Sequence, residues 1–152
     1  MSRQDDLRDI DLAFTRVGRI GRGRAATRLR AEVSGVDLTN AAVGVLGALH
    51  KGGPMRATAL AEAADTEAPL VSRELRNLTA AGYVETNPDP NDGRGRIVSL
   101  TKKGRTTYER FRSGADRITA HAFRDWDDEE IAQLRAFMQR VISDFSDPGR
   151  PD

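Results

Sequence analysis

The sequence contains no cysteine and only two histidines among its 152 residues. The lack of cysteine excludes a disulfide framework and thiol-based redox sensing. Structural zinc is held by cysteine and histidine side chains, so this composition also argues against a structural zinc site. We therefore expect no metal and no cofactor, and a fold held by an apolar core, which a chain of this length can bury.

Long apolar runs are missing as well. No stretch approaches the roughly 20 apolar residues that a membrane-spanning helix needs. The first residues, MSRQDDLRDIDLAF, do not contain the apolar run of a signal peptide. We also find no Ser-His-Asp set, no paired-carboxylate motif and no phosphate-binding glycine loop. These absences predict a cytoplasmic protein that has no membrane contact and is not an enzyme.

Charge is divided unevenly along the chain, although the net charge is only +1. Residues 16–30 carry six arginines and no acidic residue, whereas residues 113–152 carry five basic and nine acidic residues. A low net charge argues against non-specific coating of polyanions, but a locally basic surface suits DNA. Charge alone leaves open the alternative of an ordinary surface of mixed sign.

One predicted helix near the middle of the chain has two different faces. It covers residues 69–81, where Val71, Leu75 and Leu78 recur at helical spacing and can pack on a core. Glu74 lies on the same side but is expected to stay out of that core. The opposite face carries the residues Pro69, Ser72, Arg73, Arg76 and Asn77. Because Arg, Asn and Ser side chains read base edges and bind phosphates in a major groove, we expect this face to contact DNA.

Short elements are predicted on both sides of this helix. Two helices and a turn precede it. The first begins at Thr39, a natural N-cap, with Val43, Leu46 and Leu49 facing the core. The second covers residues 56–64, and the turn lies at residues 65–66. Two strands follow at residues 82–87 and 96–100, and they enclose a loop rich in Pro, Asn, Asp and Gly. Helix, turn, helix and hairpin, in this order, form a winged helix-turn-helix. We therefore predict a mainly helical (α+β) fold with a small β-hairpin wing.

The loop between the predicted strands contains DPNDGR at residues 89–94. This segment resembles the D-P-x-D-x-R wing signature of the MarR family of bacterial transcriptional regulators. LTNAAVGVLGALHKGGPMR before it and LTKKG after it are also similar, and the resemblance covers roughly residues 36–112. It implies a sequence-specific regulator of the bacterial cytoplasm, most often a repressor, that binds a pseudo-palindromic operator in double-stranded DNA as a homodimer.

The helix face and the wing together give the residues that we expect to contact DNA. They are Thr66, Ala68, Pro69, Ser72, Arg73, Arg76, Asn77, Asp92, Arg94 and Arg96. In this division the helix reads bases, and Arg94 enters a narrow minor groove, which attracts guanidinium groups. Asp92 is expected either to pair with Arg94 or to hold the loop through backbone N–H groups.

Further helices are predicted before and after this lobe. One covers residues 5–32, where Gly18, Gly21 and Gly23 either bend the helix or let another backbone pack close. Another follows Thr101, and the last begins near Asp127, which with Glu130 resembles a capping box. Their apolar stripes exceed what a small winged domain can cover, so we expect a second copy to cover them. The alternative is that these helices close onto their own domain. We divide the chain into an N-terminal dimerisation helix (1–35), a DNA-binding lobe (36–105) and C-terminal dimerisation helices (106–152).

The resemblance also implies control by a small molecule, commonly an aromatic acid or phenol, bound between the dimerisation helices and the DNA-binding lobe. The residues that we expect to line this pocket are Arg16, Arg19, Asn40, Val43 and Arg112. The competing interpretation is a winged-helix module that binds another protein and has no ligand control. Loss of DNA retention at low salt would favour that interpretation.

Overall fold

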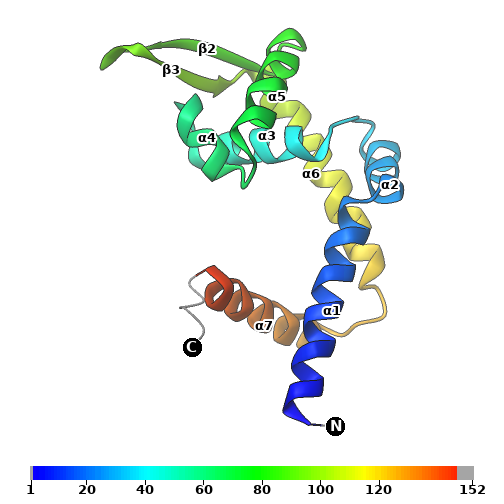
Figure 1. The fold of residues 1–152 in the computed structure, drawn as a ribbon. Helices are drawn as coiled ribbons and strands as arrows, with labels where there is room; N and C mark the ends of the chain where they lie inside the picture. Colours follow the sequence, from blue (N-terminus) through cyan, green and yellow to red (C-terminus); the bar gives the residue numbers. More distant parts are fainter. Residues whose placement is uncertain (1, 147–152) are drawn as a thin grey trace. The chain divides into compact units, whose positions relative to one another are not determined.

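The computed structural model describes residues 2–146 and divides into two compact units, with the boundary between Ala115 and Asp116. The elements are α1 (Arg3–Arg22), α2 (Arg24–Ser34), α3 (Asn40–Gly52), β1 (Met55–Arg56), α4 (Ala57–Ala63), α5 (Ala68–Ala80), β2 (Val84–Asp89), β3 (Asp92–Leu100), α6 (Lys102–Ala122) and α7 (Asp128–Ser146) (Figure 1). The unit boundary falls within α6. A mainly helical fold with a small antiparallel sheet confirms the predicted fold class. Among the described residues, none of the helices has the length and apolar character needed to cross a membrane.

The N-terminal segment, predicted as a helix over residues 5–32 that could bend at its glycines, forms two helices. The break falls at Gly23, whose extended backbone (φ −70°, ψ 161°) ends α1 and precedes α2. Two carbonyls at the end of α1 find partners elsewhere in the chain, as helix ends require. A guanidinium nitrogen of Arg30 donates to the Gly21 oxygen at 2.7 Å, and Nδ2 of Asn40 donates to the Arg22 oxygen at 3.2 Å. These two hydrogen bonds hold the elbow between α1 and α2.

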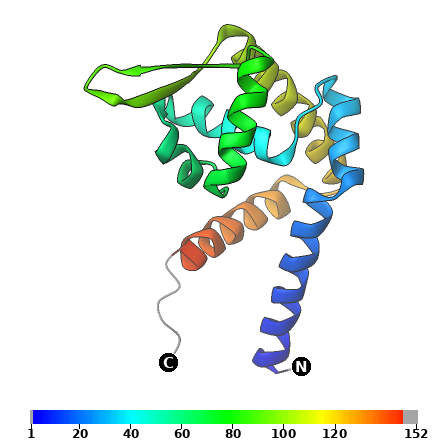
Figure 2. The same ribbon diagram turned by 45° about the horizontal axis from the view of Figure 1, so that its top comes forward.

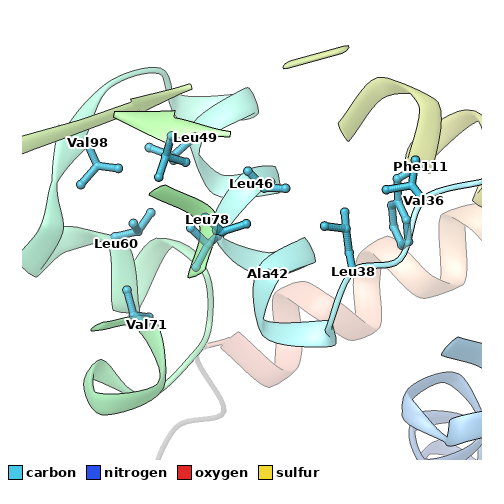
Figure 3. Close-up of a cluster of buried hydrophobic side chains, with 12 residues drawn as sticks. Val36, Leu38, Ala42, Leu46, Leu49, Leu60, Val71, Leu78, Val98 and Phe111 are labelled. Carbon is cyan, nitrogen blue, oxygen red and sulfur yellow. The ribbon is translucent and has the colours of Figure 1, made fainter. Parts of the chain in front are cut away.

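The core of the first unit lies between α3, α4, α5 and the sheet, and Figure 3 shows its side chains. The hydroxyl of Thr39 accepts the N–H of Ala42 at 3.0 Å, which confirms the predicted start of α3. Val43 packs against the core as predicted, although it is only half-buried, and Val45, which was not predicted there, is fully buried. The buried side chains of α3 are Ala42, Val45, Leu46 and Leu49, at the spacing of one helix face.

The sheet has three antiparallel strands in the order β1-β3-β2. The predicted hairpin is present, but its strands continue through most of the segment that was predicted to be a loop. β2 extends to Asp89 and β3 begins at Asp92, so the hairpin projects beyond helices α3 to α5 (Figures 1 and 2). Pro88 is accommodated because β2 is an edge strand, where a missing N–H need not break a ladder. The short strand β1 was not predicted, and it contains Arg56, which had been placed at the start of a helix.

In the second unit, a capping box begins α7, as predicted. The Asp127 carboxylate accepts the N–H of Glu130 at 2.9 Å, and the Glu130 carboxylate accepts the N–H of Asp127 at 3.0 Å. The ring of Phe123 meets Trp126 edge-on, with centroids 5.0 Å apart. No residue of α7 is buried, so the apolar side chains along this helix are at least partly exposed.

Candidate nucleic-acid interface

The helix α5 has the two faces that the sequence predicted. Val71 and Leu78 are buried, while Ser72 and Arg73 are exposed on the other side. Arg76 and Asn77, one turn further on, are exposed as well. The helix is amphipathic, and its polar face is the side with the amide, hydroxyl and guanidinium groups.

The prediction for Glu74 was wrong, because this residue is buried with an exposed fraction of 4%. Its position three residues after Val71 and four before Leu78 places it on the inner face by helix geometry. Leu75, which was expected to be buried, is only partly covered. Among the described residues no buried side-chain oxygen or nitrogen lacks a hydrogen-bond partner, so the burial of Glu74 does not leave an unsatisfied carboxylate oxygen in the core.

The turn before α5 depends on Asp65, which adopts a left-handed backbone conformation with φ 48°. Asp tolerates this conformation better than most residues other than Gly. Thr66 is half-buried, and its hydroxyl donates to the Ala64 oxygen at 3.0 Å. Glu67 occupies the N-cap position of α5, without a side-chain hydrogen bond to the first turn. Ala68 and Pro69 in the first turn of α5 are exposed.

The wing presents Arg94 and Arg96 on its exposed surface. Of the two roles considered for Asp92, the structure has the second: Oδ1 of Asp92 accepts the backbone N–H of Arg94 at 3.1 Å. The Arg94 guanidinium makes no hydrogen bond or ion pair with residues 2–146, and it is therefore available to a ligand. Arg96 donates to the Thr86 oxygen at 3.2 Å, which keeps it close to β2.

Arg56, on strand β1 next to β3, is a residue of the wing that the sequence interpretation missed. Its guanidinium pairs with Asp89 at 2.7 Å and with Asp92 at 3.4 Å. Asp89 is only 7% exposed, and its other carboxylate oxygen accepts the N–H of Asn91 at 2.9 Å. This N–H, and then Arg56, hold the pKa of Asp89 below its usual range, against the opposing effect of burial. The only signal in the sequence was a wing with two aspartates close together, which favours a nearby cation.

A pocket of about 490 Å³ lies in the first unit, where the elbow between α1 and α2 meets α3, the turn before α5, and α6. Three of the predicted ligand-pocket residues line it, namely Asn40, Val43 and Arg112. Arg16 and Arg19 do not line it, and they lie on the exposed surface of α1. Arg22 and Arg30 line the pocket instead, next to the elbow where Arg30 donates to the Gly21 oxygen and Asn40 donates to the Arg22 oxygen.

Comparisons with known proteins agree with this architecture. Residues 36–95 match the sequence profile of the MarR family. The chain is 22% identical over 138 residues to the HTH-type transcriptional repressor IacR of Pseudomonas putida, and the match covers 91% of this chain and 82% of IacR. A crystal structure of a mutant MarR from E. coli complexed with operator DNA is similar with a TM-score of 0.71 and 22% identity, covering 93% of this chain and 99% of that chain.

A second solved structure shows the same fold with a small molecule. The PcaV transcriptional regulator from Streptomyces coelicolor, in complex with its natural ligand, is similar with a TM-score of 0.64 and 20% identity. The match covers 79% of this chain and 85% of that chain. Both structural similarities establish that this chain shares the fold of those two structures.

Proposed function

Because this chain belongs to the MarR family of transcriptional regulators, we propose that it binds a pseudo-palindromic operator in double-stranded DNA as a homodimer. The family consists of DNA-binding regulators and not of enzymes, in agreement with the absence of a catalytic motif. The observation that carries the proposal is the exposed polar face of α5, with Ser72, Arg73, Arg76 and Asn77, in the same lobe as a wing whose Arg94 is unpaired among the described residues.

The chemistry of the two parts is complementary. An α-helix fits a major groove, where Arg can bind guanine O6 and N7 and Asn can bind adenine N6 and N7. Arg73 and Arg76 lie about one helical turn apart on the exposed face of α5. Both can therefore reach base edges or phosphates from the same helix. Arg94 at the wing suits a narrow minor groove, whose negative potential favours a guanidinium. Ala68 and Pro69, exposed in the first turn of α5, complete the surface.

Selection of bound sequences from a random pool of DNA duplexes tests this function. We expect enrichment of an inverted repeat whose half-sites lie about 10–10.5 bp apart, or a multiple of that spacing, because a two-fold dimer presents two recognition helices. No retention of any duplex at low salt would contradict DNA binding. It would favour the alternative that the winged helix binds another protein without ligand control.

The dimer itself is proposed from the apolar surfaces of α1 and α7. Neither helix contains a buried residue, and side chains such as Val17 (66% exposed) and Phe137 (64% exposed) lie on their surfaces. Apolar patches of this kind mark interfaces. We accordingly assign residues 1–35 and 106–152 to dimerisation and residues 36–105 to DNA binding, with a second copy of the chain as the partner.

We further propose that the regulator is a repressor released by a small aromatic acid or phenol. The pocket supports this, because ligand sites commonly have volumes of about 300–1,000 Å³ and combine apolar walls with a few polar groups. Val43, Leu70 and Phe111 supply apolar surface for a ring. Arg22 and Arg112 supply positive charge for an anionic group. The similar proteins support the two parts separately, since IacR is a repressor and PcaV has been solved with a ligand.

Calorimetry with salicylate as the probe tests the ligand site, with arginines inside and outside the pocket compared. We expect Arg112→Ala to weaken salicylate binding, and Arg16→Ala and Arg19→Ala to leave it unchanged. Saturating salicylate should weaken operator binding by up to about a hundredfold, the usual range of an allosteric coupling. A loss of affinity in Arg16→Ala alone would move the site onto α1. If no aromatic acid binds while DNA binding is intact, ligand control is contradicted.

A further inference from the structure

We propose that Arg56 is a positioning residue of the DNA-binding wing, which acts through Asp89 and Asp92 and not by touching DNA. This inference rests on the proposed DNA-binding function and deepens it. An arginine beside a DNA-binding wing would ordinarily be read as a phosphate contact. The contacts of Arg56 point to a different role.

The Arg56 guanidinium joins both ends of the wing turn. Its Nε and Nη2 atoms both reach Oδ2 of Asp89, at 2.8 Å and 2.7 Å, where β2 ends. Nη2 also lies 3.4 Å from Oδ2 of Asp92, where β3 begins. Arg56 itself belongs to β1 and pairs with Ile97 on β3, on the side away from β2. The side chain therefore links the outer strand of the sheet to the turn at the tip of the hairpin.

Each of the two carboxylates binds Arg56 with one oxygen and a backbone N–H of the turn with the other. Oδ2 of Asp89 pairs with Arg56, and its Oδ1 accepts the N–H of Asn91 at 2.9 Å. Oδ2 of Asp92 pairs with Arg56, and its Oδ1 accepts the N–H of Arg94 at 3.1 Å. A continuous chain of hydrogen bonds and ion pairs thus runs from Arg56 through Asp92 to the backbone of Arg94. The direction of the Arg94 side chain depends on that backbone.

Close packing at Gly95 restricts where the Asp89 side chain can lie. A Cβ atom added at Gly95 would lie 3.1 Å from Cβ of Asp89 and 3.3 Å from its Oδ2. Asp89 therefore lies directly against the residue that follows Arg94, and is itself only 7% exposed. A guanidinium that left Asp89 to contact a phosphate would leave a nearly buried carboxylate without its cation, which is costly. The geometry thus assigns the charge of Arg56 to the wing and that of Arg94 to DNA.

A double-mutant cycle separates positioning from direct contact. Arg56→Ala and Arg94→Ala are each expected to weaken binding of the selected operator about tenfold, because a lost arginine contact is worth about 1–3 kcal/mol. If Arg56 acts by placing Arg94, the double variant should also lose about tenfold and not a hundredfold. Fluorescence anisotropy over a salt series measures these affinities. Arg140→Ala is the control, because this arginine lies outside the wing, its side chain is 81% exposed, and helical spacing places it away from Met138 and Ile142 on α7.

A conservative variant gives an independent readout. Lysine carries the same charge but lacks the planar fork that reaches two carboxylates, so Arg56→Lys should restore only part of the affinity. Full restoration by lysine would overturn the proposal. A hundredfold loss in the double variant, with a salt slope lower by about one more unit, would show a phosphate contact by Arg56 and would overturn it as well.

The outcomes distinguish this inference from the function on which it rests. If the wild-type protein binds no DNA, the proposed function fails. If it binds and Arg94→Ala weakens binding while Arg56→Ala does not, only the positioning role fails. Should Arg56→Ala not fold, Arg56→Lys in the wild-type and Arg94→Ala backgrounds provides the same cycle with a milder change, and additive losses there overturn the proposal.

Discussion

Asp89 is a nearly buried carboxylate whose ionised form the fold stabilises. The N–H of Asn91 and the Arg56 guanidinium lower its pKa. A group with a lowered folded pKa contributes stability that is present above its unfolded pKa, about 3.9 for aspartate, and is lost as the pH falls through the folded value. We expect Asp89→Asn to lower the melting temperature near neutral pH and to have a smaller effect in strong acid.

Thermal unfolding followed by circular dichroism at about pH 7 and about pH 2 checks this sign. Asp6→Asn, at an exposed position of α1, is the control. If Asp89→Asn lowers the melting temperature equally at both pH values, the carboxylate charge does not contribute, and the variant acts only through packing.

Gly104 is fixed by the approach of another segment and not by its backbone conformation. A Cβ atom at this position would overlap the carbonyl oxygen of Tyr83 and lie 2.7 Å from its carbonyl carbon. We expect Gly104→Ala to lower the free energy of unfolding by about 1–3 kcal/mol through overpacking. This loss should outweigh the gain of about 1 kcal/mol that alanine brings to a helix.

Urea unfolding measures the effect of Gly104→Ala, and Gly93→Ala is the matched control. A Cβ atom at Gly93 would meet nothing within 4 Å, so this variant should unfold at the wild-type midpoint. Equal midpoints for both variants would contradict the steric reason given for Gly104.

At this same scale, the sequence interpretation misjudged two side chains. Glu74 was expected to stay out of the core because it is charged, yet the position of a residue on a helix follows from its neighbours, and Val71 and Leu78 carry it inward. Val45 was not predicted in the core, yet it is fully buried there, while Val43, which was expected to face the core, packs against it and is half-buried. Helical spacing predicts which residues share a face, but only packing decides how far that face rotates.

Among the elements, α5 has the most direct consequence for DNA recognition. If Arg73 or Arg76 makes a bidentate contact with guanine, replacing it with alanine removes roughly 1–3 kcal/mol of discrimination. We expect Arg73→Ala and Arg76→Ala each to relax sequence preference at one base position in each half-site. Repeating the selection from random duplexes with each variant measures this, and Arg140→Ala, at an exposed position of α7, should return the wild-type sequence. If both α5 variants return it too, another element reads the bases.

Elements whose ends depend on local hydrogen bonds could be predicted from the sequence. Thr39 caps α3, Thr101 accepts the N–H of Gly104 at the start of α6, and Asp127 with Glu130 begins α7. The strand β1 could not be predicted, because a two-residue strand exists only through its pairing with β3. The two strands of the hairpin are longer than predicted for the same reason, because strand pairing overrides the turn preference of the residues before and after the tip.

The elbow at Gly23 shows how an error in an element carries over to a site. A continuous helix over this segment made Arg16 and Arg19 the natural basic wall of a ligand pocket. With the break, Arg22 and Arg30 line the pocket together with Asn40, Val43 and Arg112. The glycines indicated that the helix could bend, but the hydrogen bonds that hold the bend come from α2 and α3.

At the scale of the whole molecule, the described chain leaves large apolar side chains exposed on α1 and on α7. On α7 they include Phe137, Met138, Ile142 and Phe145, and on α1 they include Leu7, Ile10, Leu12, Val17 and Ile20. A dimer that covers these surfaces would also supply the second recognition helix that an inverted-repeat operator requires. Assembly and operator recognition should therefore be lost together.

Phe137→Asp tests that link. Phe137 is 64% exposed, so the substitution should cost the isolated chain little stability, but a dimer would have to bury an unpaired carboxylate. Light scattering should then report a monomer where the wild type is a dimer, and affinity for the two-half-site operator should fall toward that for a single half-site. Gln139→Asp, an equally acidic change at an exposed position of the same helix, should leave both unchanged. If the wild type is itself a monomer and still binds the inverted repeat with the highest affinity of the duplexes compared, the homodimer is contradicted. The apolar faces of α1 and α7 must then be covered within one chain.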